Sequence, residues 1–190
     1  SDRTSAIAAA AGATVERHER NRGKAAALNT AFEFARRTDV STLVVMDGDW
    51  QHDPHEITEL VAPIQAGQAD IVSGSRFLPM ARGRVPAVRR IGMRALTVTS
   101  SIASGKTMTD SLSGFRAFGR LAIDALRFKS EGFSVEFEMQ FMAREDGLTV
   151  TEVPITALYD EPDRRNMFLY GVRLVDGLIQ LTARFRPWLL

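Results

Sequence analysis

Two carboxylates, Asp47 and Asp49, follow an apolar run that starts at Leu43, and only Gly48 separates them. Side chains of extended backbone alternate between faces, so residues two apart point the same way and both carboxylates can converge on one spot. Two like charges side by side are costly without a cation. Paired hard oxygens suit Mg²⁺ or Mn²⁺, which substrate phosphates commonly share. The spacing therefore predicts a divalent metal site.

A polar turn is the alternative interpretation of this stretch. Asp53 and Pro54 suit the N-cap and the first position of a helix, but this role leaves the two earlier carboxylates unexplained. His52 and His55 are three residues apart at the start of that helix and lack a third partner of suitable spacing. We therefore interpret both histidines as solvated side chains rather than zinc ligands.

Composition narrows the class of protein. The chain has 190 residues, 45% of them hydrophobic and 25% charged, as expected for one globular domain spanning residues 1–190. A formal charge of +1 gives no overall attraction to nucleic acid, so no nucleic-acid partner is expected. The absence of cysteine fits a reducing compartment, and we expect a cytoplasmic location.

Arginines are concentrated in a segment without a single acidic residue, from Ile71 to Thr109. A basic run of this kind is usually a solvated face, but clustered arginines also hold phosphates. The run contains Arg76, Arg82, Arg84, Arg89, Arg90 and Arg94.

Hydrophobic periodicity predicts alternating strands and helices. We expect strands over 13–18, 43–46, 69–73, 112–118 and 149–158, and helices over 1–11, 24–37, 54–66, 87–104, 121–126, 134–146 and 168–185. The strand over 43–46 is expected to be buried on both faces. The pattern predicts an α/β fold with a mostly parallel sheet and helices on both faces. Ligands of such sheets bind beyond the carboxyl ends of the strands, which is where the acidic pair falls.

Five segments, in order, resemble the family 2 nucleotide-sugar glycosyltransferases of the Rossmann-like GT-A fold. They are NRGKAAALNTAF, VVMDGDWQHDPHEI, ADIVSGSRF, TDSLSGFRAF and EGFSVEFEMQFMAREDGLTVTEVPI. The chain is most similar to the polyprenyl-phosphate sugar transferases, the dolichyl-phosphate mannose synthase group. Each segment alone is a weak signal, but five in order are specific.

The resemblance implies a role for particular residues. It assigns the metal to Asp47, Asp49 and Gln51, the donor to Asp2, Lys24, Asp47, Arg76 and Arg116, and the acceptor phosphate to Arg89, Arg90 and Arg94. If the acceptor is a hydroxyl, Asp110 is the expected catalytic base. For Arg116 a salt bridge that holds its loop is an equal alternative. Glu136 and Glu138, two apart on a helix, cannot share a face, so at most one faces the site and we expect the other to be solvated.

The family opens with a hydrophobic strand and an acidic DDGS element that hold the nucleotide base. This sequence starts at SDRT, inside the end of that element, with Ser1 and Asp2 as its remnant. We therefore expect the N-terminal strand to be missing from these 190 residues. Its absence would leave the strands over 13–18 and 43–46 with an unpaired edge.

The expected function is transfer of a sugar from a nucleotide diphosphate sugar to a polyprenyl phosphate, with Mg²⁺ or Mn²⁺. A hydroxyl acceptor, a noncatalytic binding module and a related nucleotidyltransferase remain alternatives. The helix over 168–185 and the following RFRPWLL mix arginines with large apolar residues. This mixture suits peripheral contact with the inner face of an anionic membrane, and it suits ordinary core packing equally well.

Overall fold

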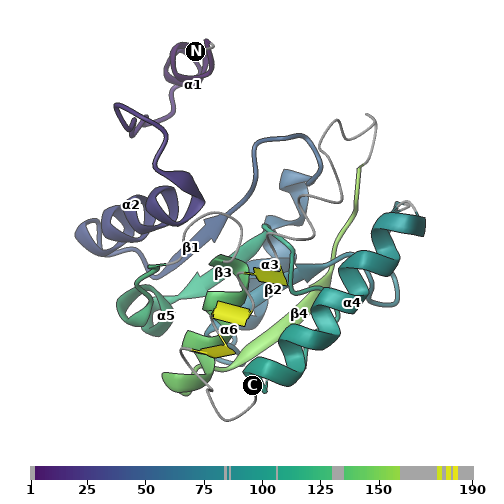
Figure 1. Ribbon diagram of the computed structural model, residues 1–190. Coiled ribbons are helices and arrows are strands. Elements are labelled where there is room, and N and C mark those ends of the chain that lie inside the picture. Colours follow the sequence, from purple (N-terminus) through teal and green to yellow (C-terminus); the bar gives the residue numbers. More distant parts are fainter. Residues whose placement is uncertain are drawn as a thin grey trace.

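The computed structural model describes residues 3–83, 85, 87–105, 107–129 and 135–158, together with 175, 176, 179, 180, 182 and 183. Its helices are α1 (Thr4–Ala10), α2 (Gly23–Arg37), the 3₁₀ turn η1 (Pro54–Glu56), α3 (Ile57–Gln65), α4 (Ala87–Ser104), α5 (Arg120–Ala125) and α6 (Val135–Glu145). Its strands are β1 (Thr42–Val45), β2 (Ile71–Ser75), β3 (Arg116–Gly119) and β4 (Val150–Pro154). Figure 1 shows the helices from α2 to α6 packed around one central sheet, with α1 standing apart near the N-terminus.

The sheet has the order β1-β3-β2-β4. Strand β3 pairs antiparallel with both β1 and β2, whereas β2 and β4 are parallel. Strands β1, β2 and β4 therefore point the same way, but two of the three pairings are antiparallel because β3 lies between β1 and β2. The expectation of mostly parallel pairing was wrong in this respect. Pro154 lacks a backbone N–H and so suits an edge strand, and β4, which contains it, lies at the end of the strand order in the described part of the chain.

Helices cover both faces of the sheet. On one face, Phe32 of α2 contacts Phe118 of β3 edge to face, at 4.9 Å between ring centroids, within a core that includes residues of α5 and α6. On the other face, Leu60 of α3 packs with Ala117 and Val72. Neighbouring residues of β3 thus belong to different cores, as the alternation of side chains along a strand requires. The predicted two-sided arrangement is confirmed.

The strand that is buried throughout is β2, not β1. Every residue of β2 is buried, whereas the four residues of β1 are only half-buried. The sequence expectation for 43–46 was wrong because β1 lies at the end of the strand order and pairs on one side only, within the described part of the chain. The apolar run alone does not distinguish an edge strand from a central one.

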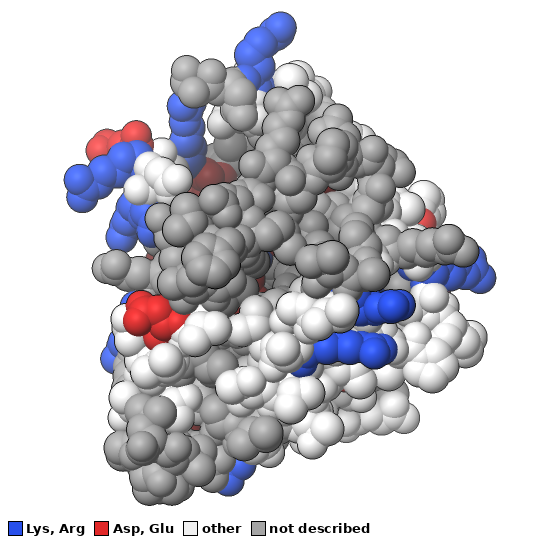
Figure 2. All heavy atoms as spheres, turned by 45° about the vertical axis from the view of Figure 1, so that its right-hand side comes forward, with Lys and Arg blue, Asp and Glu red and all other residues white. Residues whose placement is uncertain are grey.

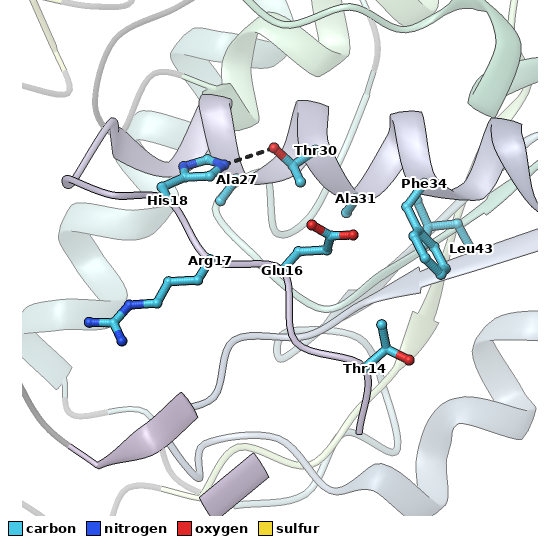
Figure 3. Close-up of a pocket in the computed structure, with 9 residues that line it drawn as sticks. All are labelled: Thr14, Glu16, Arg17, His18, Ala27, Thr30, Ala31, Phe34 and Leu43. Atoms are coloured by element: carbon cyan, nitrogen blue, oxygen red, sulfur yellow. Dashed lines mark hydrogen bonds between the residues drawn. The ribbon is translucent and has the colours of Figure 1, made fainter. Parts of the chain in front are cut away.

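Residues 13–18 form no strand. They run beside α2 and the start of β1 (Figure 3). A pocket of about 510 Å³ lies between these segments and is lined by Thr14, Glu16, Arg17, His18, Ala27, Thr30, Ala31, Phe34 and Leu43. The His18 ring is hydrogen-bonded to the Thr30 hydroxyl at 2.8 Å. This segment therefore lies close to α2 and to Leu43 of β1 without joining the sheet.

The structure agrees with the sequence predictions for one helix start and one helix end. The Asp53 carboxylate accepts the His55 N–H and Pro54 opens η1, as predicted. Gly147 follows α6 with φ of +66°. The predicted strand over 112–118 is confined to β3, because residues 112–115 belong to a loop.

Most of the predicted helix over 168–185 lies outside the described residues, although those of its residues that are described are helical. Within the part of the chain that the structure describes, no helix is both long and apolar enough to cross a membrane.

Candidate active site

Asp47 lies two residues beyond the end of β1, and Lys24 from the first turn of α2 contacts it. The Lys24 ammonium lies 3.1 Å from Asp47 Oδ1 and 3.2 Å from Oδ2. It also lies 2.8 Å from Oε1 of Glu136, in the first turn of α6. The lysine thus bridges two carboxylates that come from distant parts of the sequence.

The two carboxylates set the charge state of Lys24. Burial alone lowers the pKa of an ammonium, but Glu136 and Asp47 outweigh this effect and raise the pKa of Lys24 above its ordinary value. The side chain is therefore a fixed cation at neutral pH. It suits an anion such as a diphosphate.

Asp49 and Gln51 lie in the exposed turn that follows. The Gln51 N–H donates to Oδ1 of Asp49 at 3.2 Å, and the Gln51 carbonyl accepts the Leu158 N–H. No group of three or more His, Cys, Asp or Glu side chains within the described residues is arranged to hold a metal. Two carboxylates and an amide are nevertheless hard oxygen donors of the kind that Mg²⁺ and Mn²⁺ take, with substrate phosphates and water as the remaining ligands.

A glycine brings the loop before β3 against Asp47. A Cβ added to Gly114 would overlap Oδ2 of Asp47. The loop from Ser111 to Phe115 therefore approaches the carboxylate closely, and only a residue without a side chain permits this contact.

Arg76 and Asp110 form a buried ion pair beside this loop. Arg76 Nε lies 2.6 Å from Oδ2 of Asp110, and the Arg76 Nη2 donates to Oδ1 at 2.8 Å. The side chains are 6% and 0% exposed. Glu152 of β4 accepts the backbone N–H groups of Thr109 and Asp110 at 2.7 and 2.9 Å. To act as a base, Asp110 would have to leave a bidentate partner.

Arg116 holds the loop that contains Gly114. Its guanidinium donates to the carbonyls of Ser113 and Ser111 at 2.9 and 2.7 Å. Burial lowers the pKa of Arg116, and the nearby Glu136 carboxylate opposes that shift. These contacts fit the loop-holding alternative, although they are made with carbonyls rather than through a salt bridge.

His52 is buried, so the expectation of a solvated side chain was wrong for this residue. Its ring packs on Phe115 at 5.2 Å between centroids, and burial followed by the Arg76 charge lowers its pKa. His55 is exposed, as predicted. The chain after Asp49 turns inward at residue 52, a bend that the sequence spacing does not reveal.

The other predicted site residues are spread more widely. Arg90 and Arg94 are exposed on α4, and the Arg94 guanidinium lies over the Phe77 ring at 5.6 Å. The side chain of Arg89 and the whole of Asp2 lie outside the described residues.

Glu136 is the site residue that sequence reasoning left unassigned. The expectation that at most one of the two helix carboxylates faces the site is confirmed, because Glu138 instead accepts the Lys129 N–H at 3.0 Å with each oxygen. Both are buried, so the expected solvated partner was wrong. The sequence signal that could have identified Glu136 is an acidic residue between the apolar residues Val135 and Phe137 of the predicted helix.

Comparisons with known proteins agree with this arrangement. The sequence model of glycosyl transferase family 2 matches residues 1–123. The uncharacterized protein MJ1222 of Methanocaldococcus jannaschii is 34% identical over 183 residues, which cover 94% of this chain and 75% of that protein. The UDP-N-acetylglucosamine–dolichyl-phosphate N-acetylglucosaminyltransferase of Methanococcus voltae is 30% identical over 170 residues, which cover 87% of this chain and 68% of that one.

Among solved structures, glucosyl-3-phosphoglycerate synthase from Mycobacterium tuberculosis, in complex with Mn²⁺, UDP-glucose and phosphoglyceric acid, is similar with a TM-score of 0.70 and 20% identity. The match covers 96% of this chain and 65% of that one, slightly less than two thirds of its length. At this identity the likeness concerns the fold, which is the GT-A fold. The family match over residues 1–123 covers more than half of the chain and shows that it belongs to glycosyl transferase family 2.

Proposed function

We propose that this chain transfers a sugar from a nucleotide diphosphate sugar to a polyprenyl phosphate, with a divalent metal. The observation that carries the proposal is the group formed by Asp47, Asp49 and Lys24 at the carboxyl end of β1. It combines carboxylates for a metal with a fixed cation for a phosphate. The relative from Methanococcus voltae, whose name specifies a dolichyl-phosphate acceptor, supports the choice of acceptor.

Asp47, Asp49 and the Gln51 amide are the proposed metal ligands, and both Mg²⁺ and Mn²⁺ suit their oxygens. When bound, the metal neutralises charge that develops on the leaving diphosphate. Lys24 lies beside Asp47 and is the residue that we propose to bind that diphosphate. The Mn²⁺ in the structural relative supports a divalent cofactor.

In this proposal Arg76 and Arg116 act on the donor mainly by holding Asp110 and the loop from Ser111 to Phe115 in position. Arg76 holds Asp110 itself and Arg116 holds the loop after it. Asp2 is proposed at the donor from the family resemblance alone. A polyprenyl phosphate is already anionic, so its attack needs no strong general base. Asp110 is then a positioning residue for Arg76, and a role as base is reserved for a hydroxyl acceptor.

The exposed face of α4 is the proposed acceptor side. Arg90 and Arg94 supply positive charge there, and Arg89 is proposed with them from its place in the sequence. Ile91 and Val98 are 70% and 58% exposed on the same helix. Figure 2 brings this side of the molecule forward and shows Lys and Arg side chains projecting from it. Cations beside exposed apolar groups suit an anionic lipid surface such as the inner face of the cytoplasmic membrane. The helix over 168–185 is proposed as a second contact.

The double substitution Ile91→Ser and Val98→Ser should weaken binding to vesicles that contain phosphatidylglycerol, because α4 loses apolar area that the bilayer would bury. Cosedimentation with the vesicles measures this binding, and we expect about a tenfold loss, equivalent to about 1.4 kcal/mol. Leu121→Ser is the matched control, since Leu121 is 66% exposed on a different helix, α5. If the α4 variant and the Leu121→Ser control lose vesicle binding equally, α4 is not the part of the protein that contacts the membrane.

The proposed reaction is tested with UDP-, GDP- and dTDP-sugars, each offered with a polyprenyl phosphate or the corresponding polyprenol. We expect radiolabelled sugar to enter the lipid phase only with the phosphate, and chelation by EDTA to stop the transfer. Transfer to the alcohol would favour the hydroxyl acceptor. Donor binding without transfer to any acceptor would favour a binding module, and diphosphate formation from a sugar phosphate and a nucleoside triphosphate would favour a nucleotidyltransferase.

A further inference from the structure

We propose that Glu136 is a positioning residue that receives the Lys24 ammonium when a divalent metal takes Asp47. This inference rests on the proposed metal site. It assigns a function to the bridge between Asp47, Lys24 and Glu136.

The Lys24 ammonium occupies the carboxylate that the metal requires. It lies 3.1 and 3.2 Å from the two oxygens of Asp47. A divalent ion on the same carboxylate would repel the ammonium at short range, because like charges a few ångströms apart interact strongly in a partly buried site. Metal binding and the contact between Lys24 and Asp47 are therefore in competition.

Glu136 already holds the ammonium at 2.8 Å through Oε1. Its second oxygen, Oε2, is buried and has no hydrogen-bond partner among the described residues. Since a buried polar atom without a partner is costly, Oε2 is a ready acceptor for an ammonium released by Asp47. Lys24 can then leave Asp47 and bind both oxygens of Glu136, so its ammonium keeps a carboxylate partner throughout.

The position of Glu136 suits this transfer. It lies in the first turn of α6, is 6% exposed and faces both Lys24 and the buried Arg116. Its helix therefore keeps the carboxylate in place when the metal arrives. Lys24 stays within the site, beside the diphosphate that accompanies the metal, and does not move into solvent.

Mn²⁺ binding to the purified protein without nucleotide tests the inference, with free Mn²⁺ measured by electron paramagnetic resonance. Lys24→Gln removes the competing ammonium and should bind Mn²⁺ about tenfold more tightly, which corresponds to about 1.4 kcal/mol. Glu136→Gln leaves the ammonium with Asp47 alone and should bind Mn²⁺ about fivefold more weakly, about 1 kcal/mol. The variant that combines Lys24→Gln and Glu136→Gln should bind Mn²⁺ as tightly as Lys24→Gln alone, because Glu136 acts only by accepting the Lys24 ammonium.

A purely electrostatic effect of Glu136 would weaken Mn²⁺ binding equally with and without Lys24, and this result would overturn the proposal. So would unchanged or weaker binding by Lys24→Gln. Glu138→Gln, which alters the other buried carboxylate of α6, is the control; we expect it to lower the melting temperature without changing the affinity for Mn²⁺. If Glu136→Gln does not fold, Glu136→Asp, which keeps the charge but withdraws the carboxylate, replaces it with the same expected direction.

Asp47→Asn and Asp49→Asn separate this inference from the proposed function. If neither variant changes Mn²⁺ binding, the metal site itself is wrong. If both weaken it but the Lys24 and Glu136 variants do not move it in opposite directions, only the exchange of the lysine between carboxylates is wrong.

Discussion

Asp49→Asn is expected to reduce metal-dependent sugar transfer by about 10²- to 10³-fold, the usual loss when one group that stabilises developing charge is removed. Asp49 is exposed, and within the described part of the chain its Oδ1 accepts the neighbouring Gln51 N–H at 3.2 Å. An asparagine retains the size of the side chain and an acceptor oxygen, so the fold should survive. What is lost is one of the two negative charges that attract the metal.

Initial rates measured over a range of Mn²⁺ concentrations check this expectation, with thermal melting as the test of folding. Excess Mn²⁺ should recover part of the activity if the defect is metal affinity. Asp53→Asn is the matched control: it lies four residues away, caps η1 through the His55 N–H, and asparagine caps equally well. If the Asp49 variant retains full activity and its Mn²⁺ dependence, the acidic pair does not hold the metal.

The second large effect is expected on stability. Asp110→Ala should lower the free energy of unfolding by about 3–5 kcal/mol, the usual cost of leaving one partner of a buried ion pair without the other. The Arg76 and Asp110 side chains are 6% and 0% exposed, and two short hydrogen bonds join them. The alanine variant would leave a buried guanidinium without its carboxylate.

Urea denaturation followed by circular dichroism measures this loss. Asp124→Ala is the comparison, because Asp124 pairs with Arg120 in the same bidentate way on the surface, where ion pairs contribute little. If the two variants are equally stable, Asp110 does not have the structural role assigned here. Activity of the variants separates a positioning role from a base: a lost base lowers kcat specifically, whereas a displaced loop also raises KM for the donor.

Much of the local structure could be predicted from the sequence. The helix start at Asp53 and Pro54 was identified, and the helix predicted over 134–146 ends within one residue of the observed end of α6. Capping and turn preferences depend on a few neighbouring residues. The acidic pair at the end of β1 was located in the same way, by an apolar run followed by two carboxylates. The family followed from the order of five short segments, which no single residue could supply.

The pairing of distant segments was decided only by the tertiary structure. Nothing in the periodicity shows that β3 inserts antiparallel between β1 and β2, because alternation fixes which side chains share a face and says nothing of the direction of the neighbouring strand. Likewise, Lys24 meets Glu136, and His52 meets Phe115, only once α6 and the loop before β3 have packed. Burial and charge pairing depend on these long-range contacts, whereas the sequence alone determines which residue types are available to make them.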